Sequence, residues 1–110
     1  MTSALVARHD VFELGMDELR PGRYQPRLQL REETLAELAE SIREQGVLQP
    51  LIVRAVPGSP QDSASRTFEI VAGERRWRAA RLAGLTTVPV MVRELTDQSA
   101  LAVALIENLQ

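Results

Sequence analysis

The segment with the most distinctive chemistry is Gly73 to Arg81, which reads GERRWRAAR and holds four arginines around a lone tryptophan. An apolar run precedes it, so we expect a strand to end at Gly73 and a helix to begin near Glu74. Backbone N–H groups at a helix N-terminus favour anions, and glycine permits close approach. Arg75 and Arg76 lie in the first turn, where the helix dipole disfavours cations that face no anion. The pattern indicates a phosphate site, although an amphipathic helix with solvated or glutamate-paired arginines fits the spacing equally well.

Three further segments give weaker signals, each with a plain structural alternative. ENLQ, at Glu107 to Gln110, places a carboxylate beside an amide, a pair that can bind Mg²⁺ or orient a water, or simply lie on a helix surface. GVLQP, at Gly46 to Pro50, could present backbone groups to a base edge or be a helix-to-strand turn. QPR, at Gln25 to Arg27, lies on a loop where the proline holds the preceding residue extended. The sequence has no Walker-type phosphate loop.

Composition narrows the class of protein. The 110 residues allow one domain at most. The sequence has no cysteine, which excludes a disulfide scaffold, a thiolate zinc site and a cysteine nucleophile. The net charge of −2 does not suit a generally basic nucleic-acid binder, yet all 13 basic residues are arginine, whose planar fork suits phosphate. No apolar run approaches the length that spans a bilayer, so we expect a cytosolic protein.

The elements expected to position these residues begin with a helix over residues 32–45. A capping box between Thr34 and Glu37 would place its start at Thr34, and Gly46 is expected to end it as a left-handed residue. Residues 51–53 and 67–72 are expected to form a hairpin. The hairpin leads into the arginine-rich helix, which Gly84 ends. In that helix we expect four residues to face the core: Trp77, Ala80, Leu82 and Ala83.

The last two elements follow from residues 86–110. Residues 86–95 are expected to form a strand, and Pro89 indicates an edge strand or a strand start. Thr96 or Asp97 is expected to cap a final helix. The residues expected on the buried side of that helix are Leu101, Ala104 and Leu105.

Four segments occur in one order: QPR, GVLQPLIVR, GERRWRAARLAG and ENLQ. Together they resemble the N-terminal domain of the ParB family of chromosome and plasmid partition proteins, over about Leu19 to Gln110. The resemblance implies a small α/β domain with a short mixed sheet and flanking helices, related in shape to sulfiredoxin, that binds CTP. The absence of cysteine argues against the chemistry of sulfiredoxin itself.

The resemblance also implies roles for individual residues. Those implied to bind the triphosphate are Arg27, Gly73, Glu74, Arg75, Arg76 and Asn108. Those implied to line the cytosine pocket, largely through backbone, are Gly46, Val47, Leu48 and Gln49. Those implied to support slow hydrolysis are Gln25, Glu74 and Glu107. Those implied to hold Mg²⁺ are Glu107 and Asn108.

In the family, CTP acts as a clamp switch. The resemblance implies a weak CTPase in a cytoplasmic, nucleoid-associated bacterial protein whose N-terminal domains engage each other on binding CTP and close a ring around DNA. We expect a tail with a first short strand over residues 1–18 and the ParB-like domain over 19–110. The family's helix-turn-helix domain, which reads a centromere-like DNA site, and its dimerisation domain are absent from this chain. The tail before Val11 lacks the basic, glycine-containing motif with which many members stimulate a ParA-type ATPase, so that partner is doubtful.

Two other functions fit the same residues. A DNA-binding or transcriptional adaptor would use the arginines on DNA phosphates without nucleotide turnover, and would bind duplexes in a salt-dependent way. An ATP-using enzyme on the same fold would prefer ATP and would need a nucleophile or base, for which only Glu74 and Glu107 are candidates.

Overall fold

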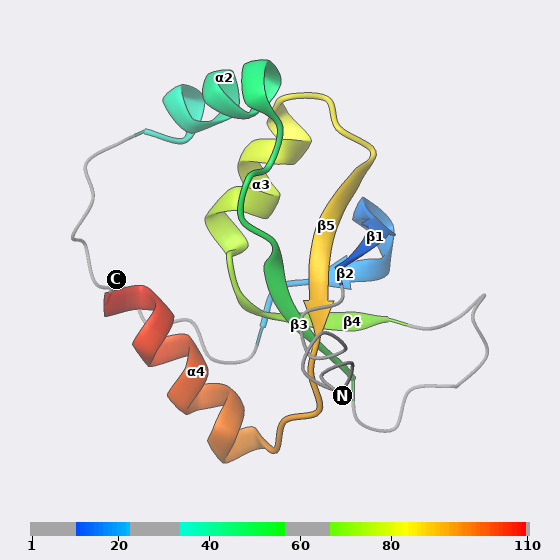
Figure 1. The fold of residues 1–110 in the computed structure, drawn as a ribbon, viewed down its shortest axis with the longest axis vertical. Helices are drawn as coiled ribbons and strands as arrows, with labels where there is room; N and C mark the ends of the chain where they lie inside the picture. Colours follow the sequence, from blue (N-terminus) through cyan, green and yellow to red (C-terminus); the bar gives the residue numbers. More distant parts are fainter. Residues whose placement is uncertain (1–10, 23–33, 57–66, 110) are drawn as a thin grey trace, which may run out of the picture.

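A five-stranded mixed sheet with helices on both faces forms the fold (Figure 1). The structure is a computed structural model, and it describes residues 11–22, 34–56 and 67–109. The elements in chain order are β1 (Phe12–Gly15), the 3₁₀ turn η1 (Met16–Glu18), β2 (Leu19–Arg20), α2 (Leu35–Gln45), β3 (Leu51–Ala55), β4 (Phe68–Ala72), α3 (Glu74–Leu82), β5 (Thr87–Val92) and α4 (Asp97–Leu109).

The strand order is β1-β5-β3-β4-β2. The pairs β1–β5 and β3–β4 are antiparallel, whereas β3–β5 and β2–β4 are parallel. The predicted hairpin is therefore present as β3 and β4, and α3 connects β4 to β5. This is the small α/β fold with a mixed sheet that the resemblance predicted.

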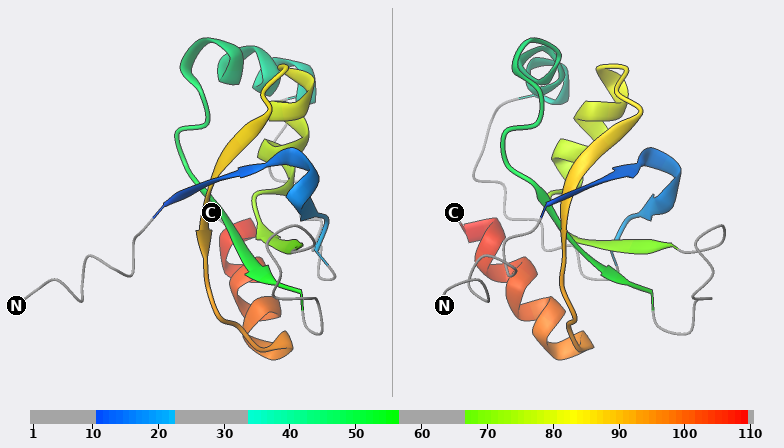
Figure 2. Two further views of the ribbon diagram at one scale, coloured as in Figure 1. Left: turned by 90° about the vertical axis from the view of Figure 1, so that its right-hand side faces the viewer. Right: turned by 45° about the vertical axis from the view of Figure 1, so that its right-hand side comes forward.

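Successive side chains of a strand point to opposite faces of the sheet, and the buried apolar residues accordingly form two clusters, one on each face. Leu51 and Val53 of β3 pack in a cluster with residues of α2 and α3. Ile52, between them, packs in a second cluster with Ala100 and Ala104 of α4. The helices α2 and α3 therefore cover one face and α4 covers the other, and Figure 2 shows α4 apart from the α2–α3 pair.

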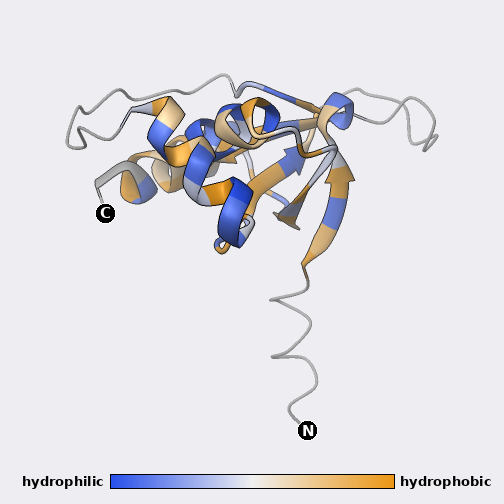
Figure 3. Cartoon of the chain, turned by 90° about the horizontal axis from the view of Figure 1, so that it is seen from above, coloured by the Kyte–Doolittle hydropathy of each residue, from blue (hydrophilic) through white to orange (hydrophobic). Residues whose placement is uncertain are grey.

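Each helix presents both hydrophilic and hydrophobic residues around its axis, as Figure 3 shows by colour. This is typical of helices that pack one side against a sheet. Among the described residues, none of the helices combines the length and the apolar character needed to cross a membrane.

The start of α2 follows the predicted capping box. The backbone N–H of Glu37 donates to Oγ1 of Thr34 over 3.1 Å, and the N–H of Thr34 donates to Oε1 of Glu37 over 3.0 Å. Such reciprocal bonds satisfy N–H groups that the first turn leaves without helical partners. At the other end, Gly46 has φ +78° but ψ −178°. The expectation of a left-handed residue is correct in the sign of φ, but the extended ψ turns the chain out toward β3.

The core-facing side of α3 differs from the prediction at two positions. Trp77 and Ala80 are buried as expected, and Ala79 is fully buried as well. Leu82 is 54% exposed, so its assignment to the core was wrong. At the last turn the chain is already leaving the helix toward Gly84, which has φ +92°.

The position of β5 in the sheet also corrects the prediction. This strand lies between β1 and β3, so it is not an edge strand. Pro89 is tolerated because pairing with β3 begins only at Val90, and the preceding residues pair with β1 alone. The strand therefore has one neighbour where the proline lies and two neighbours beyond it.

The buried side of α4 was only partly predicted. Ala104 is buried, together with Ala100, but Leu101 and Leu105 are 38% and 41% exposed. The two alanines are four residues apart and form a narrow seam that lets the helix approach the sheet closely. The larger leucines lie outside that seam.

Candidate functional site

Gly73 joins β4 to α3 in a backbone conformation that favours glycine. Its φ of +106° and ψ of 20° are left-handed. A Cβ at this position would lie 3.0 Å from Cγ of Leu51 and 3.0 Å from Nη2 of Arg76. Both the conformation and the close packing therefore require the absence of a side chain. The prediction that a strand ends here and a helix begins at Glu74 is confirmed.

Arg76 connects the start of α3 to the segment between α2 and β3. Its Nη1 donates to the carbonyl oxygen of Gln49 over 2.8 Å and to that of Pro50 over 3.2 Å. These partners are 27 and 26 residues away in the sequence. The predicted phosphate segment and the predicted base segment are thus held together by one guanidinium group.

The side chain of Glu74 forms an ion pair within α3. Its Oε2 accepts from Nε of Arg78, one turn later, over 2.8 Å. Its Oε1 is buried and has no hydrogen-bond partner within the described part of the chain. Oε2 is therefore engaged by an arginine of its own helix. Since Oε1 can only accept, it suits a donor such as a water or hydroxyl.

Trp77 packs beneath this surface. It is 6% exposed, and the guanidinium carbon of Arg81 lies 4.5 Å from its ring centroid, within cation–π range. Of the four arginines in the segment, one therefore binds loop carbonyls, one pairs with a glutamate and one stacks on the tryptophan. The fourth, Arg75, is exposed in the first turn and makes a contact of its own. The internally paired arginines that were the structural alternative are therefore present, and the anion site stays a prediction.

The segment from Gly46 to Gln49 is largely exposed. Val47 packs against the core, whereas Leu48 is 78% exposed. The N–H of Gly46 donates to the carbonyl of Ile42 over 2.7 Å, which closes α2. An apolar side chain this exposed, beside open backbone, provides a surface on which a planar group could pack.

Glu107 lies near the end of α4 and is half-buried, and Asn108 follows it in the same helix. The helix begins beside Glu69, near the start of β4, and its two buried alanines pack with Val71 and Ala72 farther along that strand. Because β4 leads into Gly73, α4 runs along β4 toward the start of α3. No cluster of three or more acidic, His or Cys ligands occurs among the described residues.

Gln25 and Arg27 lie outside the described residues, as does Gln110. Their predicted roles stay predictions. The structure thus brings Gly73 and Arg76 together with the segment after α2, and it directs α4 toward them.

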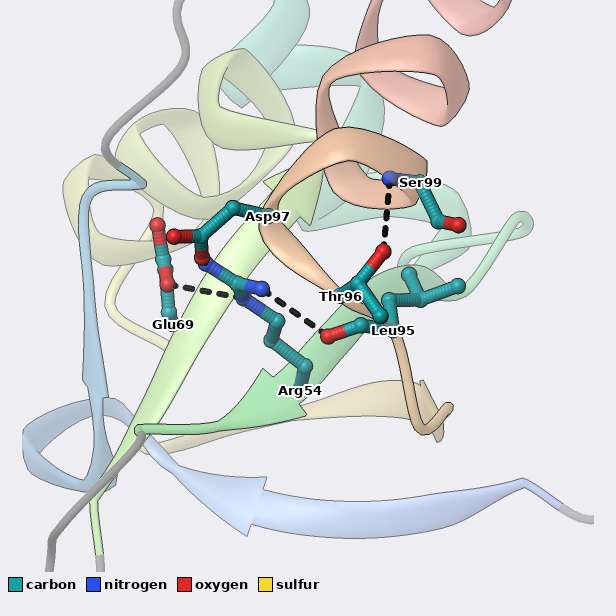
Figure 4. A network of polar contacts seen from close by, with 6 residues as sticks. All are labelled: Arg54, Glu69, Leu95, Thr96, Asp97 and Ser99. Atoms are coloured by element: carbon teal, nitrogen blue, oxygen red, sulfur yellow. Dashed lines mark hydrogen bonds and ion pairs between the residues drawn. The ribbon is translucent and has the colours of Figure 1, made fainter.

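A buried charge network, which the sequence interpretation missed, lies on the α4 face of the sheet (Figure 4). Arg54 of β3 is 2% exposed, and its Nε donates to Oε1 of Glu69 over 3.0 Å. Its Nη1 donates to the carbonyl of Leu95 over 2.9 Å, and its Nη2 to Oδ1 of Asp97 over 2.8 Å. A signal was present: opposite charges interrupt two apolar runs, LIVRA and FEIVA, that were expected to pair.

Arg54 keeps its positive charge in this buried position. Burial by itself lowers the pKa of a guanidinium, but the hydrogen bonds that Arg54 donates to Asp97 and Glu69 and the negative charges of these carboxylates outweigh it. The pKa of Arg54 is therefore raised above its ordinary value, and the group stays protonated. A buried arginine and a buried carboxylate neutralise each other directly across β3 and β4, where they face each other in register.

Comparison with known proteins gives close relatives. The chain is 62% identical over 97 residues to a probable plasmid-partitioning protein ParB of Deinococcus radiodurans, covering 88% of this chain and 31% of that protein. It is 57% identical over 97 residues to a probable chromosome-partitioning protein ParB of Xylella fastidiosa, covering 88% of this chain and 29% of that protein. The chain thus spans about a third of the length of these relatives.

Solved structures share the fold. A C-terminally truncated chromosome-partitioning protein ParB from Caulobacter crescentus, complexed with CTP-gamma-S, is 50% identical with a TM-score of 0.78, over 92% of this chain and 53% of that chain. The same protein complexed to the centromeric parS site is 45% identical with a TM-score of 0.68, over 89% and 46%. Sulfiredoxin from Arabidopsis thaliana is 26% identical with a TM-score of 0.57, over 87% and 97%, which agrees with the predicted likeness in shape.

A family model covers nearly the whole chain. Residues 2–109 match the model described as the ParB N-terminal domain. The family predicted from the four ordered segments is confirmed, and the chain belongs to the ParB N-terminal domain family.

Proposed function

We propose that this domain binds CTP and serves as the nucleotide switch of a ParB-type partition protein. One observation carries the proposal: Arg76, in the first turn of α3, holds the carbonyls of Gln49 and Pro50. A triphosphate at the helix N-terminus and a base at the Gly46–Gln49 segment would then share one connected surface. The solved relative complexed with CTP-gamma-S, which is 50% identical, supports the same ligand.

The proposed contacts follow the chemistry of each group. Backbone N–H groups after Gly73 and the guanidinium groups would bind phosphate oxygens. The exposed backbone and side chain of Leu48 would pack against cytosine. The residues proposed for the triphosphate are Arg27, Gly73, Glu74, Arg75, Arg76 and Asn108. The residues proposed for the base are Gly46, Val47, Leu48 and Gln49.

Slow hydrolysis to CDP and phosphate is part of the proposal. A water would attack the γ-phosphorus in line with the bond to the β-phosphate oxygen, which breaks as the new P–O bond forms, while arginines offset the developing charge. Gln25, Glu74 and Glu107 are the groups proposed to orient this water or accept its proton. Mg²⁺ typically takes one or two carboxylates or amides together with substrate phosphates, a donor set that Glu107 and Asn108 fit.

In the whole protein, we propose that CTP drives two such domains to engage and close a clamp on DNA. The solved relative complexed to the centromeric parS site supports a DNA partner for the family. Binding of that DNA would use a helix-turn-helix domain outside this chain, and the protein would work in the cytoplasm at the nucleoid.

Calorimetric titration with CTP, ATP, GTP and UTP in the presence of Mg²⁺ tests the ligand. We expect heat of binding with CTP alone. Preference for ATP would favour an ATP-using enzyme. Salt-dependent binding of duplex DNA, without nucleotide binding, would favour the adaptor function.

Replacing Arg76 by alanine is expected to weaken CTP binding by roughly 10- to 100-fold, because charge-assisted hydrogen bonds are worth about 1.5–3 kcal/mol. The change also releases the carbonyls of Gln49 and Pro50. Arg93→Ala, which removes an exposed arginine just after β5, is the matched control and should bind CTP normally. Equal affinity of both variants and the wild type would contradict the phosphate assignment.

Replacing Glu107 by glutamine is expected to slow CTP hydrolysis by roughly 10²-fold while binding changes little, because a lost general base typically costs that much. Phosphate release and calorimetry measure the two effects separately. Hydrolysis at the wild-type rate would move the catalytic role to another residue.

A further inference from the structure

The network around Arg54 joins the sheet to the start of α4. Each of the three guanidinium nitrogens of Arg54 donates to a different partner: Glu69 in β4, the carbonyl of Leu95, and Asp97 at the first residue of α4. The first partner belongs to the sheet, and the other two belong to the segment where α4 begins. Figure 4 shows the guanidinium between these groups.

The two carboxylates have different surroundings. The side chain of Glu69 is 6% exposed, whereas that of Asp97 is 53% exposed. Glu69 therefore neutralises the buried charge inside the sheet, and Asp97 is not needed for that purpose. Asp97 instead fixes the position of α4, because its hydrogen bond with Arg54 specifies where the first turn of the helix must lie. Ionic groups that specify one arrangement among several are a recognised use of partly buried pairs.

The apolar contacts of α4 specify its position less strongly. Its buried side chains are Ala100 and Ala104, which pack against Ile52, Val71 and Ala72 of the sheet, with the partly buried Val103 beside them. Small side chains let the helix lie close, but they offer few protruding groups that would resist rotation or sliding. Larger side chains on the same helix stay substantially exposed, at 38% for Leu101 and 55% for Ile106.

The length of α4 amplifies any change at its start. Glu107 lies ten residues after Asp97, about 15 Å along a helix. A tilt of about 20° at Asp97 would move Glu107 by about 5 Å over that length. Misplacement of a reacting group by about 1 Å can already cost a factor of about 10² in rate.

We propose that Arg54 is a positioning residue for the nucleotide site: through Asp97 and the carbonyl of Leu95 it sets the placement of α4 on the sheet, and so the placement of Glu107. The inference rests on the proposed CTPase function. Arg54 and Asp97 themselves lie at the opposite end of α4 from Glu107.

Variants of Asp97 test this directly, because removing Arg54 would leave Glu69 buried without its partner and could unfold the domain. Asp97→Ala removes the acceptor, and Asp97→Asn keeps an oxygen that can accept from Nη2. Gln98→Ala, at the next residue of the same turn and outside the network, is the matched control. Two measurements are made on each chain: amide hydrogen exchange over residues 102–109, and CTP binding with hydrolysis.

The expected result for Asp97→Ala is at least tenfold faster exchange in the second half of α4 and at least tenfold slower hydrolysis, with a smaller loss of CTP affinity, because Asn108 is one of several residues proposed for the triphosphate. Asp97→Asn should restore most of both, and Gln98→Ala should match wild type. Unchanged exchange or unchanged hydrolysis in Asp97→Ala would overturn the positioning role while CTP binding by wild type still stood. Failure of the wild-type chain to bind CTP would instead overturn the proposed function, and this inference with it.

Discussion

Replacing Trp77 by alanine is expected to lower the free energy of unfolding by about 3–5 kcal/mol, the range found when a buried aromatic side chain is removed from a core. The indole is 6% exposed and packs in the cluster that joins α3 to the sheet and α2. The variant also loses the contact between the ring and Arg81. Folded domains are stable by only about 5–15 kcal/mol, so this loss is a large share of the total stability.

The measurement is urea unfolding followed by circular dichroism, because Trp77 is the only tryptophan and its fluorescence is lost in the variant. Leu82→Ala is the matched control on the same helix, since Leu82 is 54% exposed and alanine favours helix. A loss of stability no larger than that of the control would show that the indole is not part of the core.

Replacing Gly73 by alanine is expected to lower the free energy of unfolding by roughly 2–4 kcal/mol, combining backbone strain at positive φ with overpacking. The new Cβ would lie 3.0 Å from Cγ of Leu51, which is fully buried and cannot move cheaply. It would also lie 3.0 Å from Nη2 of Arg76, whose guanidinium is held on two loop carbonyls. Displacing that guanidinium should weaken CTP binding as well.

Gly84→Ala separates the two causes of this effect. Gly84 has φ +92°, close to that of Gly73, but a Cβ there would meet nothing within 4 Å. Its replacement should therefore cost only the backbone strain and leave CTP affinity unchanged. Equal losses of stability in the two variants, with CTP affinity intact in both, would show that the packing around Gly73 plays no part.

Local features of this protein could be read from its sequence because they depend on residues close together in the chain. The capping box of Thr34 and Glu37 spans three residues, and both of its hydrogen bonds form as predicted. The boundary at Gly73, between β4 and α3, follows from an apolar run that meets a glycine and a charged helix start. The order of the four short segments was enough to identify the family.

The sequence predicted the separate segments of the candidate site but not their arrangement in space. The sequence indicated anions at the start of α3 and a base near residues 46–50, but no spacing rule places these segments side by side. The link is made by Arg76, whose partners are 27 and 26 residues away. The individual ligand roles of Glu107 and the other site residues stay predictions for the experiments above.

Only the tertiary structure determined which side chains are buried in the core and which charged groups form ion pairs. Leu82, Leu101 and Leu105 fit a helical apolar stripe, yet each is substantially exposed, because other residues of the same helices, such as Ala79 in α3 and Ala100 and Ala104 in α4, face the core. Arg54 and Glu69 stand in strands where apolar residues were expected to pair, and their burial depends on strand register and on α4. Local sequence therefore determined where elements begin and end, whereas long-range packing determined which faces are covered and how the charges are neutralised.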